Sequence, residues 1–119
     1  NMKKIPSPSI IKSVGNKPKI IKEYIGRVNT DTDVISIAKM NSPSGWKEPG
    51  QTPEFDEYTL VLKGELKVES LKEVLLLKEG EAVIVNSGEW VRYSTPDKGA
   101  EYIAVCLPAF GPEIVNRDA

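Results

Sequence analysis

Glycine and proline divide this chain into short β-rich segments, and this division constrains the fold more than any other feature. Nine glycines and nine prolines are distributed over 119 residues. The runs between them are rich in β-branched and aromatic residues, and none has the capped 3.6-residue periodicity of a helix. We therefore expect an all-β domain, either a sandwich or a barrel. The expected strands are Lys19–Ile25, Val34–Met40, Tyr58–Leu62, Leu66–Glu69, Ala82–Val85, Trp90–Tyr93 and Glu101–Leu107.

The connections between these strands carry further expectations. Lys63-Gly64-Glu65 has the composition of a tight turn, so we expect a hairpin there. Residues 69–77 include an apolar stripe compatible with a short helix, but the alternation around it favours two short strands joined by a turn. Residues 41–53 hold three prolines and two glycines and are expected to form a loop, with Trp46 as its one large side chain.

Size, charge and cysteine content narrow the class of protein. A chain of 119 residues fits one domain, in which we expect residues 31–119 to form the barrel. Sixteen basic and seventeen acidic residues are interspersed, a balance that does not favour binding to nucleic acid or to a membrane. Cys106 is the only cysteine and excludes an internal disulfide, which suits a reducing compartment. Because no apolar stretch follows Lys3 and Lys4, no signal peptide is expected, and we expect a cytoplasmic protein.

The beginning of the chain has its own character. Prolines at positions 6 and 8 predict that residues 1–30 start as an extended, poorly packed segment. We expect this segment to pack on the barrel or on a partner subunit. Ile20, Ile21 and Ile25 offer apolar surface there, and exposed sheet edges must be covered, so we expect a homodimer formed near this segment.

Two glycine-framed segments resemble the paired motifs of the cupin superfamily. In the first, Gly45, Glu57 and Gly64 occupy their positions in the pattern Gly, five residues, His-x-His, three or four residues, Glu, six residues, Gly. In the second, Gly80 and Gly88 have the expected separation. Glycine suits tight corners between barrel strands because it tolerates positive φ and close backbone approach. The match covers residues 45–95 and implies a cupin jelly-roll barrel similar to small single-domain cupins, including the ethanolamine-utilisation cupin-like group.

The resemblance also shows which chemistry has been lost. Transferred by position, the metal-binding quartet of the family becomes Gln51, Pro53, Glu57 and Val91, and the chain contains no histidine at all. Proline and valine have no donor atoms, and one carboxylate with one amide makes a poor transition-metal site. We therefore expect no metal and no cofactor. A hard cation such as Mg²⁺ held by Glu57 and water is the alternative.

Glu57 is the central candidate of the expected pocket. Strand alternation places it on the same face as Thr59, and a carboxylate inside a barrel would be desolvated, the condition for a general base. Tyr93 is its candidate acid partner. The alternative is that Glu57 closes the barrel mouth through a salt bridge or hydrogen bond and that Tyr93 is a core residue. The full set of candidate ligand-binding residues is Gln51, Glu57, Thr59, Val91, Tyr93, Tyr102, Cys106 and Trp46.

Other residues admit a functional and an ordinary interpretation. Arg27 and Arg92 could hold an anionic ligand, although pairing with the many glutamates is the more common use. Cys106 has no histidine to activate it as a nucleophile and is expected to be a small core residue. Trp46 could line the rim of a pocket or fix a loop to the core.

Three functions remain open at this stage. The first is metal-independent binding of a small polar or aromatic metabolite inside the barrel. The second is an isomerase or lyase that uses Glu57 and Tyr93 as an acid–base pair. The third is a structural dimer with a filled barrel. An open cavity lined by polar side chains would favour the first two, and a solidly packed interior would favour the third.

The donor set predicts the metal content of the purified protein. Because three of the four inherited positions have lost their imidazole, elemental analysis should find well under one equivalent of Zn, Fe, Mn, Ni or Cu per chain. The protein should be purified without a metal resin and without chelator, so that neither adds nor removes an ion. A full equivalent located at the barrel centre would contradict the prediction.

Overall fold

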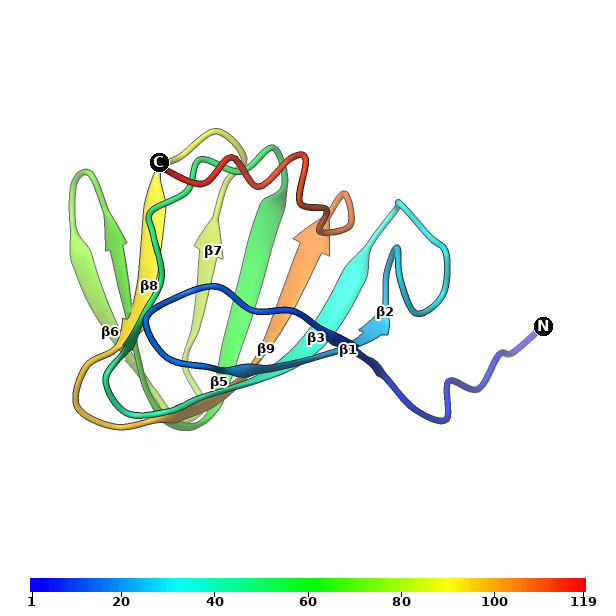
Figure 1. The fold of residues 1–119 in the computed structure, drawn as a ribbon, viewed down its shortest axis with the longest axis horizontal. Helices are drawn as coiled ribbons and strands as arrows, with labels where there is room; N and C mark the ends of the chain where they lie inside the picture. The colour runs from blue at the N-terminus through cyan, green and yellow to red at the C-terminus, as the bar shows by residue number, and fades with distance from the viewer.

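The computed structural model describes residues 1–119 and consists of strands without helices, which confirms the all-β expectation. Figure 1 shows the strands curling around a common interior. The strands are β1 (Ser9–Ile11), β2 (Ile20–Ile25), β3 (Ser36–Ser42), β4 (Trp46–Lys47), β5 (Asp56–Ser70), β6 (Val74–Lys78), β7 (Ala82–Val85), β8 (Val91–Thr95) and β9 (Ala100–Leu107).

All strand pairs are antiparallel, and β5 belongs to both halves of the barrel. Its first half pairs with β7 and β9, and β9 continues through β3 and β2 to β1. Its second half pairs with β6 and β8, and β8 pairs with β4. The last strand, β9, therefore lies between β3 and β5 in the middle of the larger sheet (Figure 1).

The expected hairpin at Gly64 is wrong, because β5 runs through it as one strand of 15 residues. The register against β9 shifts between Val61 and Lys63, and Gly64 has φ +77°. A bulge with a glycine at positive φ bends a strand without ending it. A Cβ on Gly64 would collide with the carbonyl oxygen of Gly99. The glycine is therefore needed where the strand passes from one sheet to the other, instead of in a turn.

Other local expectations have mixed outcomes. The choice of strands over a helix in residues 69–77 is confirmed, since β5 extends to Ser70 and β6 begins at Val74. The expected loop of residues 41–53 contains the short strand β4, which the prolines and glycines around it concealed. Within the segment expected to start extended, β1 pairs with β2 along three residues.

The segment after β1 lies across the opening of the barrel (Figure 1). Asn16 fixes it there: its backbone N–H donates to the carbonyl of Lys47 at 3.0 Å, and its side-chain oxygen accepts from the N–H of Lys47 at 2.8 Å. Ile21, which the sequence offered as a dimer contact, lines the interior, whereas Ile20 is half exposed on the other face of β2. Alternation along the strand separates the two.

Two separate groups of buried apolar side chains pack inside the barrel. The larger group includes Trp46, Val61, Leu66, Val91, Tyr93 and Tyr102, among ten residues. The smaller consists of Phe55, Cys106 and Val115, with Phe110 packed against it. The candidate site is a cavity lined by members of both groups, including Tyr93 and Tyr102 of the larger and Cys106 of the smaller.

None of the elements is a helix of the length and apolarity that a membrane span needs.

The bend in β5 predicts unequal effects of two alanine substitutions. Gly64 and Gly80 both have positive φ, at +77° and +83°, but a Cβ on Gly80 would meet nothing within 4 Å. Gly80→Ala should therefore lose only about 1 kcal/mol of unfolding free energy, the cost of the left-handed conformation. Gly64→Ala adds a backbone collision and should lose about 2–4 kcal/mol. Urea denaturation of both variants measures the difference, and equal losses would contradict the assigned role of Gly64.

Candidate functional site

A cavity of about 70 Å³ lies between the two apolar groups. Alternate residues of the larger sheet face it: Ile21 and Glu23 from β2, Ser36, Ala38 and Met40 from β3, Glu57 and Thr59 from β5, and Tyr102, Ala104 and Cys106 from β9. This is the two-residue period of a strand with one face turned inward. An apolar cavity of about 150 Å³ holds benzene, so this one suits a smaller occupant.

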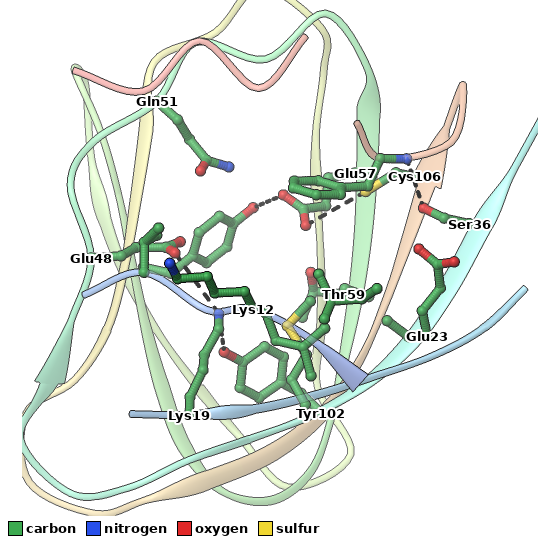
Figure 2. A pocket seen from close by; sticks show the side chains of 18 of the residues that line it. Lys12, Lys19, Glu23, Ser36, Glu48, Gln51, Glu57, Thr59, Tyr102 and Cys106 are labelled. Carbon is green, nitrogen blue, oxygen red and sulfur yellow. Dashed lines mark hydrogen bonds and ion pairs between the residues drawn. The ribbon is translucent and has the colours of Figure 1, made fainter. Parts of the chain in front are cut away.

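Glu57 is at the centre of one polar cluster in this cavity. The hydroxyl of Tyr93 donates a hydrogen bond of 2.8 Å to its Oε1, and the thiol of Cys106 donates a weak one of 3.8 Å to its Oε2 (Figure 2). Glu57 of β5 and Tyr93 of β8 thus contact each other inside the barrel. Tyr102 and Cys106 of β9 also line the cavity.

Burial sets the proton equilibria of this cluster. Desolvation raises the pKa of Glu57 to about 7, although the Tyr93 hydrogen bond opposes the rise. Desolvation and the neighbouring Glu57 carboxylate raise the pKa of Tyr93, so its hydroxyl stays protonated and remains a donor. The same two causes raise the pKa of Cys106, which removes it as a thiolate nucleophile. Glu57 is therefore the group of this cluster that changes charge near neutral pH.

A second polar cluster surrounds Lys19, just before β2. Its ammonium is 3.8 Å from the carboxylate of Glu48 and 3.5 Å from the hydroxyl of Tyr102 (Figure 2). It also lies 4.1 Å from the centre of the Trp46 ring, a cation–π distance. Burial raises the pKa of Glu48, and the charges of Lys19 and Arg117 oppose that rise. The cavity thus contains a buried ion pair that the sequence did not reveal.

The end of the chain completes the wall. Gln51 forms isolated bridges with Val91 on one side and Arg117 on the other. The side chains of Gln51 and Arg117 line the cavity, and the Arg117 guanidinium lies 5.8 Å from the centre of the Phe110 ring. The Nε atom of Arg117 is buried and has no hydrogen-bond partner.

Six of the eight candidate residues from the sequence line one cavity: Gln51, Glu57, Thr59, Tyr93, Tyr102 and Cys106. Val91 and Trp46 do not line it. Both are completely buried in the larger apolar group, Val91 beneath its bridge to Gln51 and Trp46 beneath the Lys19 ammonium. The ring N–H of Trp46 donates to the carbonyl of Val14, so this side chain also fixes the segment across the opening.

Sequence reasoning missed five charged residues of the wall: Lys12, Lys19, Glu23, Glu48 and Arg117. Period-two alternation could have found two of them, because Lys19, Ile21 and Glu23 share the inward face of the β2 segment. Glu23 is used locally, where its Oε1 accepts from the N–H groups of Val28 and Asn29 at 3.0 and 2.9 Å. Lys12, Glu48 and Arg117 lie outside the regular strands, so no periodicity marked them.

The two arginines that the sequence put forward for anion binding have other partners. Arg92 pairs with Glu69 at 2.9 and 3.3 Å, and Arg27 donates to the carbonyl of Ala109 at 3.2 Å.

The residues at the family's metal positions do not fit a metal. Pro53 and Val91 are buried and offer no donor atom, and both oxygens of Glu57 already accept hydrogen bonds. No group of three or more His, Cys, Asp or Glu side chains converges anywhere in the structure. The chemistry of this site is therefore derived from its own side chains.

This chain is similar to a curated protein in sequence and to several solved structures in fold. No family model matches the sequence. One curated protein, the endoribonuclease YbeY of Myxococcus xanthus, is 44% identical over 103 residues, which are 84% of this chain. The chain spans about a third of the length of that protein, 34%.

Solved structures match at lower identity and over most of the chain. The polyketide cyclase RemF from Streptomyces resistomycificus has a TM-score of 0.78 at 17% identity, covering 100% of this chain and 87% of its own. Oxalate decarboxylase from Bacillus subtilis has 0.77 at 15%, covering 95% and 30%. The Clostridium difficile EutQ protein has 0.65 at 21%, covering 76% and 63%. These neighbours are cupin-fold proteins, and with the helix-free curled sheet they establish the fold: this chain is an all-β protein with a cupin jelly-roll barrel.

Proposed function

We propose that this protein binds a small polar metabolite inside the barrel without the help of a metal. The observation that supports this most is the cavity itself, which a purely structural barrel would fill with apolar side chains. Polar groups from β5, β8, β9 and the segment after β4 converge on it, among them Gln51, Glu57, Thr59 and Tyr93. A concave site with a few convergent polar groups is the usual form of a small-molecule site.

The dimensions of the cavity favour a polar ligand over an aromatic one. At about 70 Å³ it is roughly half the size of a cavity that accommodates benzene. Gln51 can donate and accept hydrogen bonds, and Thr59 and Tyr93 supply hydroxyl groups. A ligand of a few non-hydrogen atoms with hydroxyl, carbonyl or carboxyl groups could satisfy these partners.

Acid–base catalysis is the second candidate, and the pKa of Glu57 near 7 favours it. A general base works best when its pKa lies close to the working pH. In such an isomerase or lyase, the Glu57 carboxylate would accept a proton from the substrate. The Tyr93 hydroxyl, now 2.8 Å from that carboxylate, would donate a hydrogen bond or a proton to the substrate oxygen.

We do not extend the endoribonuclease activity of the Myxococcus xanthus relative to this chain. That name belongs to a protein of which the chain spans about a third. Within the chain, sixteen basic residues are balanced by seventeen acidic ones, so no charge excess attracts the RNA backbone.

Replacing Glu57 by Gln tests the role of this carboxylate, because the change keeps the shape and removes the charge. Ligand-observed NMR against a set of small polar metabolites should find ligands for the wild type. Glu57→Gln should weaken binding only of those that donate a proton or carry positive charge. If the protein is an enzyme, the same change should remove most of its activity. Glu79→Gln, on the exposed turn before β7, is the matched control and should behave as the wild type. A set with no ligand at millimolar concentration would count against the proposal.

The raised pKa of Glu57 also predicts how stability depends on pH. The unfolded chain releases this proton near pH 4.5, whereas the folded chain keeps it until about 7. The contribution of Glu57 to the unfolding free energy should therefore be largest below pH 4.5 and should fall by up to about 3 kcal/mol by pH 8. Glu57→Gln should lose less over the same range, because its amide does not titrate. Urea denaturation between pH 4.5 and 8 measures both slopes, and parallel curves would show that Glu57 titrates normally.

A further inference from the structure

We propose that the ligand of this cavity is the carboxylate of a small organic acid, bound between the Lys19 ammonium and the Arg117 guanidinium. The proposal rests on the proposed binding function and names its ligand class. Both cations line the same cavity, although they come from opposite ends of the chain.

The Lys19 ammonium has N–H donors without a short hydrogen bond. Its side chain is only 6% exposed, so water does not solvate the ammonium freely. The ammonium has three N–H donors, yet its two polar partners lie at 3.5 and 3.8 Å, the outer limit of hydrogen bonding or beyond it. The Trp46 ring, 4.1 Å away, stabilises the charge without accepting a conventional hydrogen bond. A ligand oxygen in the cavity would supply the short acceptor that is missing.

Arg117 has the same deficit, and it is independent of the first. Its Nε is the one buried side-chain nitrogen or oxygen in the structure without a hydrogen-bond partner. A buried donor that stays unsatisfied costs roughly 1–3 kcal/mol, more when it is charged, so such groups are rare in native proteins. Guanidinium presents its N–H groups in a fork that matches the two oxygens of a carboxylate. The bridge between Gln51 and Arg117 holds this fork at the cavity wall.

The charge balance of the wall points in the same direction. The cations that line the cavity are Lys12, Lys19 and Arg117, and the anions are Glu23, Glu48 and Glu57. Glu23 is occupied by two backbone N–H groups. Glu48 is under the influence of both Lys19 and Arg117, so two cations share one anion. Whenever Glu57 is protonated, the region between the two cations carries excess positive charge.

Proton uptake by Glu57 should therefore accompany binding. The titratable groups that act on Glu57 are Tyr93, Cys106, Glu48 and Lys19. Tyr93 and Cys106 are neutral at pH 7, so an entering carboxylate adds to the repulsion from Glu48 and favours the protonated form of Glu57. A protonated Glu57 can also donate a hydrogen bond to the ligand. Affinity for a carboxylate should rise as the pH falls from 8 to 6.

The experiment compares acetate with two probes of similar size, acetamide and methylammonium, by NMR titration of the ¹⁵N-labelled full chain at pH 6 and pH 8. Acetate should shift the backbone resonances of residues around the cavity in a saturable way. It should bind at least about tenfold more tightly than acetamide, because hydrogen bonds between charged groups are the stronger ones. Its affinity should be higher at pH 6.

Two variants test the contributions of Lys19 and Arg117 one at a time, and a third variant is the control. Lys19→Met and Arg117→Gln should each weaken acetate binding at least about tenfold, whereas Lys98→Met, at an exposed position outside the cavity, should leave it unchanged. Circular dichroism confirms that each variant is folded. Lys19→Arg restores the positive charge and should recover part of the affinity. The comparison of acetate with acetamide on the wild type holds even if a variant unfolds.

Three results would overturn the inference. Acetamide binding as tightly as acetate would show a neutral polar site, and the proposed function would survive alone. Preference for methylammonium would show that Glu48 and Glu57 select a cation. Binding of acetate that both variants and Lys98→Met leave unchanged would place the acid elsewhere. Failure of all three probes, together with failure of the metabolite set above, would remove the binding function itself.

Discussion

The bend of β5 at Gly64 is the constraint on which the rest of the structure depends. One strand supplies pairing edges to both halves of the barrel, so the two sheets face each other without a separate linker. Its first half turns Glu57 and Thr59 into the cavity, and its second half places Leu66 and Val68 in the larger apolar group. Two antiparallel sheets that share a bent strand necessarily enclose an interior, and the side chains near the bend determine how much of it stays open.

The charged groups around the open part of that interior cost folding free energy, because they are buried. Glu57, Glu48 and Lys19 are all removed from solvent, and buried charges are rarely retained unless they are paired. Here the pairing is loose around Lys19 and Arg117, and the raised pKa of Glu57 shows that desolvation outweighs its hydrogen bonds. Strained electrostatics of this kind are common at sites that act on a ligand. The proposed function rests on these groups, and the surrounding sheets hold them in place.

Sequence alone predicted the barrel and six of the residues that line its cavity, and the reasons are physical. Glu57, Thr59, Tyr102 and Cys106 were placed correctly because alternation along a strand fixes the face of every second residue. The continuity of β5 was missed, since a glycine at positive φ suits a turn and a bulge equally. Arg117 and Glu48 could not be found by periodicity, because tertiary contacts alone bring these loop residues to the cavity. Val91 also points inward, as alternation predicts, but other side chains cover it completely. Alternation predicts the face on which a residue lies and not how deeply it is buried.

The central place of β9 has a consequence for how the protein acquires its structure. Ser36 pairs with Cys106 and Asp56 with Leu107, so the middle of the larger sheet joins residues far apart in sequence. While the chain is being synthesised, β3 and β5 each present an unpaired edge until residues 100–107 have left the ribosome. Contacts of such long range slow folding, and open strand edges are where nascent chains associate wrongly. The barrel can therefore close only after β9 has been synthesised, and the cavity cannot exist before that moment.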